Sequence, residues 1–261
     1  MHPVTPSTCL ACLLAGLLSA PVLRAQDSAS NTLPIPPLPT AAPRAKVAEP
    51  EESLSTVIKP AGSAKAAHVA TLSPDEIEGY DGYPAPLQTL VTEALALTKL
   101  NLRYQFGSSD PKSGGMDCSG TIYHLLHKLG VSDVPRQSSE VCDWTMRQSM
   151  LYRTEHVGNL KDPAFSAMKP GDLLFWTGTY ESNAPRSTPV THVMIYLGKR
   201  KENGKPVIFG ASDGRSFDGE RQNGVSVFDF PLPKPGSPAE FYGYAPLPSA
   251  AWEKIRGGKS R

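Results

Sequence analysis

Two residues of this chain, Cys118 and His192, have the side-chain types of a nucleophile and its general base. Apolar residues follow the cysteine at helical spacing, at Ile122, Leu125, Leu126 and Leu129. This pattern predicts that a helix starts near Cys118 and that the thiol lies on its inward-facing stripe. The free N–H groups and dipole of a helix N-terminus favour a thiolate, so we expect a lowered thiol pKa. The same N–H groups can stabilise an oxyanion.

His192 opens an apolar segment, residues 192–197, of the kind found in a buried strand. A histidine at the start of a core strand can meet a helix N-terminus across the core, which is what a Cys–His nucleophile requires. The structural alternative for a lone cysteine is a small buried hydrophobic side chain. Asp117 opposes a thiolate at Cys118 unless its carboxylate caps the helix or faces a substrate amine.

His124 and His127 are rival candidates, as a pair of metal ligands. On a helix wheel both fall on the face opposite Cys118, beside Lys128, so we expect them to face solvent. Only two cysteines, Cys118 and Cys142, follow residue 25, and neither Cys-x-x-Cys nor His-Glu-x-x-His spacing occurs there. We therefore expect no metal ion and no cofactor.

The segments that must position these residues are predicted to be helices first and strands afterwards. One helix is expected over residues 86–99, after a helix-start signature at residues 73–76, and the next runs from Cys118 to a stop at Gly130. Short apolar segments then predict strands at 172–176, 191–197, 206–210, 224–228 and 241–245. This order predicts an α+β fold over residues 75–248, with helices packed on an antiparallel sheet of about five strands. Residues 249–261 are expected to form a basic tail.

The N-terminal part of the chain has the composition of an export signal followed by a linker. Residues 9–18 are a short apolar run, and Ala25 precedes the expected cleavage point of a signal peptide at residues 1–25. A buried N-terminal helix is the alternative. Residues 26–74 are rich in Pro, Ala, Ser and Thr and almost free of aromatic residues, which predicts a disordered linker. We expect an exported protein, in the periplasm or at the cell wall.

The charge balance excludes one class of partner. The 261-residue chain has 26 Lys and Arg against 25 Asp and Glu, so no basic excess indicates nucleic-acid binding. We also expect no membrane span and a monomeric protein. In an exported protein, a disulfide between Cys118 and Cys142 is chemically permitted.

Five segments in order resemble the NlpC/P60 family of cysteine peptidases. They are YQFG at 104–107, GMDCSG at 115–120, PRQS at 135–138, KPGDLLFW at 169–176 and THVMIYLG at 191–198. The third corresponds to the family's Pro-Arg-Thr/Ser segment, the fourth to its Pro-Gly-Asp-Leu strand and the fifth to its His-Val-Gly-Ile-Tyr strand. The resemblance covers about 85–230 and implies a papain-like core.

The resemblance also implies a reaction and roles for residues. It implies hydrolysis of amide bonds in peptidoglycan stem peptides, often the D-γ-glutamyl–diamino-acid bond, with Cys118 attacking and His192 activating it. By the same resemblance Tyr104 orients substrate or the oxyanion, and Asp117 and Ser119 hold a substrate amine. For Tyr104, packing in the core is the alternative that the residues alone favour.

The chain departs from the family at the third catalytic position. Family members carry a polar residue there, on the strand after the histidine, whereas this chain has Gly210. We expect Asp213 to orient His192, because the Asp213-Gly214 turn can swing the carboxylate back toward the site. Ser212 is the alternative from strand parity, about two residues (~6.6 Å) beyond Gly210. A backbone carbonyl or a water molecule is a third choice.

A second departure is the long stretch before the histidine strand, residues 177–190, which we expect to border the substrate groove. Two further hypotheses stay open besides the active peptidase. One is a pseudoenzyme that binds wall peptides without cleaving them, which the missing third residue favours. The other is a structural envelope protein in which Cys118 and Cys142 are joined.

Overall fold

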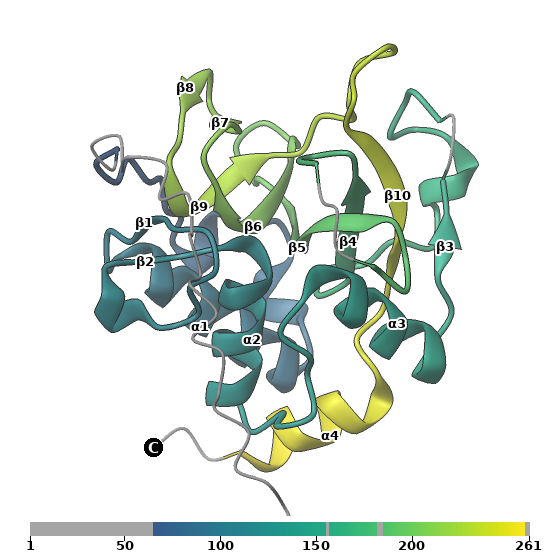
Figure 1. Ribbon diagram of the computed structural model, residues 1–261. Helices are drawn as coiled ribbons and strands as arrows, with labels where there is room; N and C mark the ends of the chain where they lie inside the picture. Colours follow the sequence, from purple (N-terminus) through teal and green to yellow (C-terminus); the bar gives the residue numbers. More distant parts are fainter. Residues whose placement is uncertain (1–64, 155–156, 182–184, 259–261) are drawn as a thin grey trace, which may run out of the picture. The chain divides into compact units, whose positions relative to one another are not determined.

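The computed structural model of the chain describes residues 65–154, 157–181 and 185–258 (Figure 1). All of them belong to one compact unit within Ile58–Arg261. The predicted signal peptide, residues 1–25, and the predicted linker as far as residue 64 lie outside the described residues. Within the described part of the chain, every helix is too short or too polar to cross a membrane.

The largest element of the fold is a six-stranded antiparallel sheet with the strand order β3-β10-β4-β5-β6-β9. Its strands are β3 Tyr152–Arg153, β4 Leu173–Thr177, β5 Val190–Lys199, β6 Pro206–Ser212, β9 Gly224–Asp229 and β10 Glu240–Ala245. Two small sheets flank it, one of parallel strands β1 Arg103–Tyr104 and β2 Gly115–Met116, and one of antiparallel strands β7 Ser216–Phe217 and β8 Glu220–Arg221.

Four α-helices accompany the sheet in the described residues: α1 Ala85–Thr98, α2 Cys118–Lys128, α3 Ser138–Gln148 and α4 Ser249–Gly257. Helix α2 packs on β5 and β6, α1 packs on β9, and α4 packs on α1. In Figure 1 the helices α1, α2 and α4 lie together, below strands β5 and β6 in this view. The chain thus has an α+β fold, as the sequence predicts, with one more strand than the five expected.

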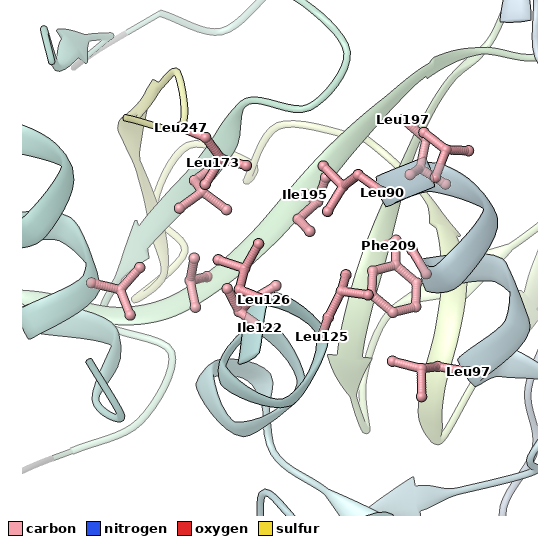
Figure 2. Packing of buried hydrophobic residues seen from close by; sticks show 14 of the residues in the cluster. Leu90, Leu97, Ile122, Leu125, Leu126, Leu173, Ile195, Leu197, Phe209 and Leu247 are labelled. Atoms are coloured by element: carbon pink, nitrogen blue, oxygen red, sulfur yellow. The ribbon is translucent and has the colours of Figure 1, made fainter. Parts of the chain in front are cut away.

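The side chains of the sheet alternate between two buried clusters. On the helix-covered face, Val193 and Ile195 of β5 and Phe209 of β6 join the apolar stripe of α2. Figure 2 shows Leu125 and Leu126 of α2 directed toward Phe209 and Ile195. On the other face, Trp176 of β4 packs in an aromatic cluster with the alternate residues of the same strands. This period of two is what a strand buried on both faces requires.

The predicted linker ends earlier than expected, because residues 65–74 pack on the domain. The N–H of His68 donates to the carbonyl of Asn223 at 3.1 Å, and the N–H of Asn223 donates back at 2.7 Å. Leu72 is buried in the core beside α1. The expected helix start at residues 73–76 is a single turn of 3-10 helix, Pro74–Glu76, with a Ser73–Glu76 capping box. These residues cover the outer edge of β9, which their local composition does not indicate.

The expected basic tail is also wrong over residues 249–257. This segment forms α4, whose Ala251 and Ile255 are buried, while Lys254 and Arg256 supply its basic last turn. Two apolar residues four positions apart are enough to dock a short helix on a neighbour, although they give a weak pattern in the sequence.

Candidate active site

Cys118 is the first residue of α2, and its thiol lies against the backbone of β5. Its sulfur is 4.0 Å from the carbonyl oxygen of Thr191, and the N–H groups of Val193 and Ser119 point toward it. These contacts put the sulfur beside the two peptide groups that flank His192. Cys118 is buried and free, and so is Cys142, so the structure holds no disulfide between them. The predicted meeting of a helix N-terminus with the histidine strand is therefore present in the fold.

Asp117 is the N-cap of α2, and its carboxylate is held by hydrogen bonds beside Cys118. Its Oδ1 accepts the N–H of Gly120 at 2.6 Å, and its Oδ2 accepts the N–H of Gly107 at 2.7 Å. The guanidinium of Arg136 donates to both oxygens, at 3.0 and 2.8 Å. A carboxylate offers about four acceptor positions, and these four donors use them. The side chain is thus committed to internal partners rather than open to a substrate amine.

Ser119 belongs to the same network, because its hydroxyl accepts from Arg136 at 3.0 Å and donates to Asp117 at 3.4 Å. Gly120 is required by the same packing. A Cβ atom at this position would lie 2.1 Å from the carbonyl oxygen of Ser108, whose loop closes over the helix N-terminus. The Asp-Cys-Ser-Gly sequence therefore builds a rigid helix start, and Arg136 ties it to the segment before α3.

The thiol of Cys118 does not have the lowered pKa that its place at a helix N-terminus predicts. Burial raises its pKa to about 11, and the charge of Asp117 adds to the effect. The N–H groups of Val193 and Ser119 and the charge of Arg136 act in the opposite direction without overcoming burial. Desolvation disfavours the thiolate more than the helix dipole favours it, so the sulfur is a neutral thiol near pH 7.

His192 is buried on β5, paired in register with Trp176 of β4. The two rings meet edge to face with centroids 5.6 Å apart. Burial lowers the pKa of His192 well below its usual value, and the positive charge of Arg215 acts in the same direction. The ring is therefore neutral near pH 7 and able to accept a proton. Its Nε2 atom is buried without a hydrogen-bond partner, and no hydrogen bond joins the ring to Cys118 in this structure.

Cys118 and His192 line two separate hollows. One, of about 590 Å³, exposes Cys118 and is lined by Tyr104, Phe106, Tyr180, Glu181 and Arg186. The last three come from the long segment before β5, so the described part of residues 177–190 borders the hollow of Cys118. The other hollow, also about 590 Å³, is lined by His192 together with Trp176, Ser212, Asp213, Arg215 and Asp229. Cys118 and His192 therefore line different hollows.

Tyr104, on β1, lines the first hollow together with Cys118. Burial raises the pKa of its hydroxyl well above the usual value, and the nearby groups Cys118, Asp117 and Asp213 add to this. The phenol therefore stays protonated over the whole range in which proteins function, and it remains a hydrogen-bond donor. A neutral donor beside the sulfur suits a developing oxyanion.

Comparison with known proteins decides the family. Residues 101–218 match the family model described as NlpC/P60 family, a span that contains both Cys118 and His192. Residues 101–218 form a domain of the NlpC/P60 family. Proteins of this family are generally cysteine peptidases associated with the cell wall. A search of curated proteins found no match to the chain.

The third catalytic position of the NlpC/P60 pattern is filled from the opposite strand. A Cβ atom at Gly210 would lie 3.0 Å from Cγ of Met194 and 3.5 Å from its Cβ and Cε. Met194 stands where the family's His-Val-Gly-Ile-Tyr strand has glycine. The side chain of Met194 thus occupies the space beside Gly210, and glycine at this position offers no side chain to Nε2 of His192, which has no partner.

Neither candidate for an orienting residue has a hydrogen bond to His192 in the described structure. Asp213 is exposed, its carboxylate makes no hydrogen bond in the described structure, and its charge acts on Tyr104 rather than on His192. A carboxylate beside the ring would raise the imidazole pKa, whereas that pKa is lowered. Ser212 lines the same hollow as His192, but its hydroxyl accepts the N–H of Gly214 at 3.3 Å. The expected contact of Asp213 with His192 is therefore absent.

Sequence reasoning missed Arg215, whose guanidinium lies 4.2 Å from the centroid of the Trp176 ring. Only its position after the Asp213-Gly214 turn brings it to the site, and no local pattern marks it. His124 and His127 are half-buried rather than solvent-facing, and neither lines the two hollows. Among the described residues, no group of three or more His, Cys, Asp or Glu side chains is arranged to hold a metal ion.

Proposed function

We propose that this NlpC/P60 protein is a cysteine peptidase that hydrolyses an amide bond of peptidoglycan stem peptides, with Cys118 as nucleophile and His192 as general base. The observation that carries the proposal is the position of the Cys118 sulfur at the start of α2, between the peptide groups on either side of His192. The expected bond is the D-γ-glutamyl–diamino-acid amide. The support for that bond is the family's usual substrate, since the hollows alone do not define it.

The reaction starts from two neutral groups. The Cys118 sulfur attacks the carbonyl carbon while the ring of His192 takes the thiol proton, and the carbonyl oxygen becomes an oxyanion. The N–H groups at the start of α2 and the hydroxyl of Tyr104 are the available donors to that oxygen. Because the thiol pKa is raised to about 11, proton transfer must accompany attack instead of preceding it.

The remaining steps return the proton and consume one water molecule. The protonated ring gives its proton to the amine nitrogen, the C–N bond breaks, and a thioester on Cys118 remains. His192 then removes a proton from water, which attacks the thioester and releases the carboxylic acid with the thiol restored. The lowered pKa keeps the ring neutral near pH 7, so it starts each step able to receive a proton.

We assign Cys118 and His192 to a dyad whose ring is held by packing instead of by a third polar residue. Trp176 supplies the edge-to-face contact, and Met194 closes the place of the third side chain. Structures of enzymes without substrate often lack the catalytic hydrogen bond that forms when substrate binds. The Cys118–His192 hydrogen bond is accordingly expected to form in the substrate complex. Asp117 and Ser119 position the helix start in this scheme, and Glu181 is the carboxylate of the first hollow that is open to a substrate amine.

We also propose that the protein is exported and acts in the periplasm or at the cell wall. The support is the apolar run at residues 9–18 followed by small residues before Gln26. Mass determination of the N-terminus of protein recovered from the producing cells tests this, and an intact residue 1 on the accumulated protein would overturn it.

Digestion of defined muropeptides tests the activity. Purified protein is incubated with L-Ala-γ-D-Glu-meso-diaminopimelate, and products are read by mass spectrometry. Release of free diaminopimelate together with the Ala-Glu dipeptide supports the proposal and identifies the bond. Cleavage at another bond of the peptide would support the proposed peptidase activity and contradict the proposed cleavage site.

Three observations favour a second function, a wall-peptide-binding protein without turnover. The thiol pKa is raised, the ring lacks an orienting partner, and the two do not hydrogen-bond in the structure. Intact muropeptide after prolonged incubation, together with saturable binding by calorimetry, would favour this function over hydrolysis.

A further inference from the structure

The indole ring of Trp176 contacts two other groups of the site, His192 and Arg215. Its centroid is 5.6 Å from the centroid of the His192 ring, and the guanidinium carbon of Arg215 lies over it at 4.2 Å. The fully buried indole also meets Phe230 and Phe241 edge to face, with centroids 5.9 and 5.0 Å away. Contacts on several sides fix the position of the indole, so it can in turn fix a ring that packs against it.

The backbone of Arg215 is held at the start of the β7–β8 hairpin. Its carbonyl oxygen accepts the N–H of Gln222 at 2.9 Å, across the hairpin. In the turn before it, the guanidinium of Arg221 donates to the carbonyl oxygen of Asp213 at 3.3 and 3.1 Å. These bonds fix the backbone from which the Arg215 side chain extends to the indole.

The guanidinium of Arg215 is a cation without an anion. The side chain is half-buried, and within the described residues the guanidinium has neither an ion-pair nor a hydrogen-bond partner. A cation that is partly removed from water and unpaired lowers the stability of a fold. Stacking on an indole face offsets part of this loss, because a guanidinium is planar and weakly hydrated. A destabilising group that a fold holds beside its candidate base indicates a role in the reaction.

The ring of His192 needs a contact that orients it. A general base must direct its free nitrogen at the proton that it takes. Nε2 of His192 has no hydrogen-bond partner within the described residues, and Gly210 offers it no side chain. The edge-to-face contact with Trp176 is therefore the orienting contact that the structure supplies.

We propose that Arg215 is a positioning residue of the dyad, because it holds the Trp176 indole by stacking and the indole holds the His192 ring. This inference rests on the proposed peptidase function. In it, a stacked cation and an indole take the place of the polar third residue of the family. A carboxylate in that place would favour the protonated ring, whereas the guanidinium favours the neutral one.

The charge of Arg215 acts on both members of the dyad. Burial has the larger effect on His192, and the charge of Arg215 lowers the pKa of the ring further. Burial also lowers the pKa of Arg215 itself, to about 10, while a negative charge on Cys118 acts in the opposite direction. Arg215 is therefore charged at neutral pH, and it favours negative charge on the sulfur together with a neutral ring.

The other titratable groups around the ring come from several elements. Those of its own hollow are Asp213, Asp229 and Lys234. Those of the Cys118 hollow are Tyr104, Asp117, Cys118, Arg136, Tyr180, Glu181 and Arg186. Helix α3 also packs on β5, and the charged residues of α3 that line neither hollow are Glu140, Asp143 and Arg147. Arg215 is the charged group that acts with burial to lower the pKa of His192.

Two variants of Arg215 separate its charge from its stacking. Arg215→Gln removes the charge, so the pKa of His192 and the acid limb of kcat/KM should both move to higher pH, by roughly one unit. Arg215→Lys keeps the charge and loses the planar stack, so kcat should fall roughly tenfold with little change in KM or in the acid limb. Lys205→Gln removes an exposed cation from the β5–β6 turn and, as the control, should match the wild type.

Trp176→Phe tests the route through the indole. If Arg215 acts through Trp176, then Arg215→Lys should change kcat less than about twofold in a Trp176→Phe background. Equal losses in both backgrounds would mean that Arg215 acts without the indole, and they would overturn the inference. Rates are measured with L-Ala-γ-D-Glu-meso-diaminopimelate, and thermal melts follow the stability of each variant.

An NMR titration of His192 in the Cys118→Ala protein separates this inference from the proposed function, because it requires no turnover. The signal is assigned by its loss in His192→Gln. A raised pKa in Arg215→Gln without turnover by the wild type would refute the peptidase and support the contact of Arg215 with the ring. Turnover by the wild type, with kcat of Arg215→Lys and the acid limb of Arg215→Gln both unchanged, would overturn the inference and support the peptidase. Losses of kcat that follow losses of melting temperature, with the pKa unchanged, would make Arg215 a structural residue and overturn the inference as well.

Discussion

Met194 on β5 and Gly210 on β6 divide one space between them, since a Cβ at Gly210 would lie 3.0 Å from Cγ of Met194. In the family pattern, the strand of the histidine has a glycine and the next strand has a polar residue. In this chain the first of these positions is Met194 and the second is Gly210. The exchange keeps the core filled and removes the side chain that would bind Nε2 of His192. In the proposed dyad, His192 therefore has no third polar residue.

The exchange predicts strong coupling between the two positions. Gly210→His alone is expected to destabilise the domain by about 1–3 kcal/mol through overpacking against Met194. Met194→Gly together with Gly210→His should recover most of that loss relative to the single variants, because the new imidazole then has room. Urea unfolding of the four proteins measures the coupling, and additive effects would show that the two residues do not share the space. A kcat of the double variant at or above that of the wild type would further identify Nε2 as the atom that lacks a partner.

The pH dependence of alkylation follows from the thiol pKa of about 11. An acid whose folded-state pKa is raised holds its proton to higher pH, so the thiolate fraction rises about tenfold per unit between pH 6 and 10. Iodoacetamide labelling of the Cys118 peptide, followed by mass spectrometry, should accelerate across this whole range. Cys142, whose pKa burial raises to about 12, is the internal reference and should react more slowly. A rate at Cys118 that is constant from pH 6 to 9 would reveal a preformed thiolate and contradict the neutral starting state.

The Asp117–Arg136 pair is expected to matter for folding more than for substrate binding. Arg136→Ala leaves a buried carboxylate with two N–H donors in place of four, at a cost of about 2–3 kcal/mol. It also removes a charge that lowers the thiol pKa, so alkylation of Cys118 at pH 8 should slow. Asp117→Asn combined with Arg136→Ala should be less unstable than Arg136→Ala alone, because no unpaired charge remains. A raised KM with an unchanged free energy of unfolding in Arg136→Ala would contradict this prediction. It would indicate that the Asp117 carboxylate binds the substrate amine.

Much of this site can be predicted from local sequence. The remaining parts depend on contacts between segments that are distant in the sequence. The helices at 85–98 and 118–128 and the five longest strands are confirmed, because each has a strong apolar period. Helix α3 was not predicted, since Ser138–Gln148 is mostly polar and has few apolar positions. The direction of the Cys118 pKa shift was wrong because the helix N-terminus is visible in sequence, whereas burial against β5 is not. Arg215 reaches the site only through the fold.

The edge of β9 gives a prediction about the N-terminal boundary. A protein that starts at residue 65 keeps the pairing of His68 with Asn223 and the 3.1 Å bond from the N–H of Val227 to Ala70, whereas one that starts at residue 74 loses both. The shorter protein also loses the buried Leu72, and we expect a total cost of roughly 3–6 kcal/mol. Thermal melts of the two proteins against the full chain measure this. Equal melting temperatures for the proteins that start at residues 65 and 74 would mean that residues 65–73 do not stabilise the domain and belong to the linker.

The central claim is that Cys118 carries the reaction, and turnover of one defined muropeptide by two single variants tests it most directly. Both cysteines are buried and free, so Cys118→Ala and Cys142→Ala are closely matched in chemistry and in packing loss. Release of diaminopimelate from L-Ala-γ-D-Glu-meso-diaminopimelate is followed by mass spectrometry, with circular dichroism to verify both folds. We predict a loss of at least about a thousandfold in kcat for Cys118→Ala and a change of less than about threefold for Cys142→Ala. Comparable turnover by wild type and a folded Cys118→Ala protein would contradict the account.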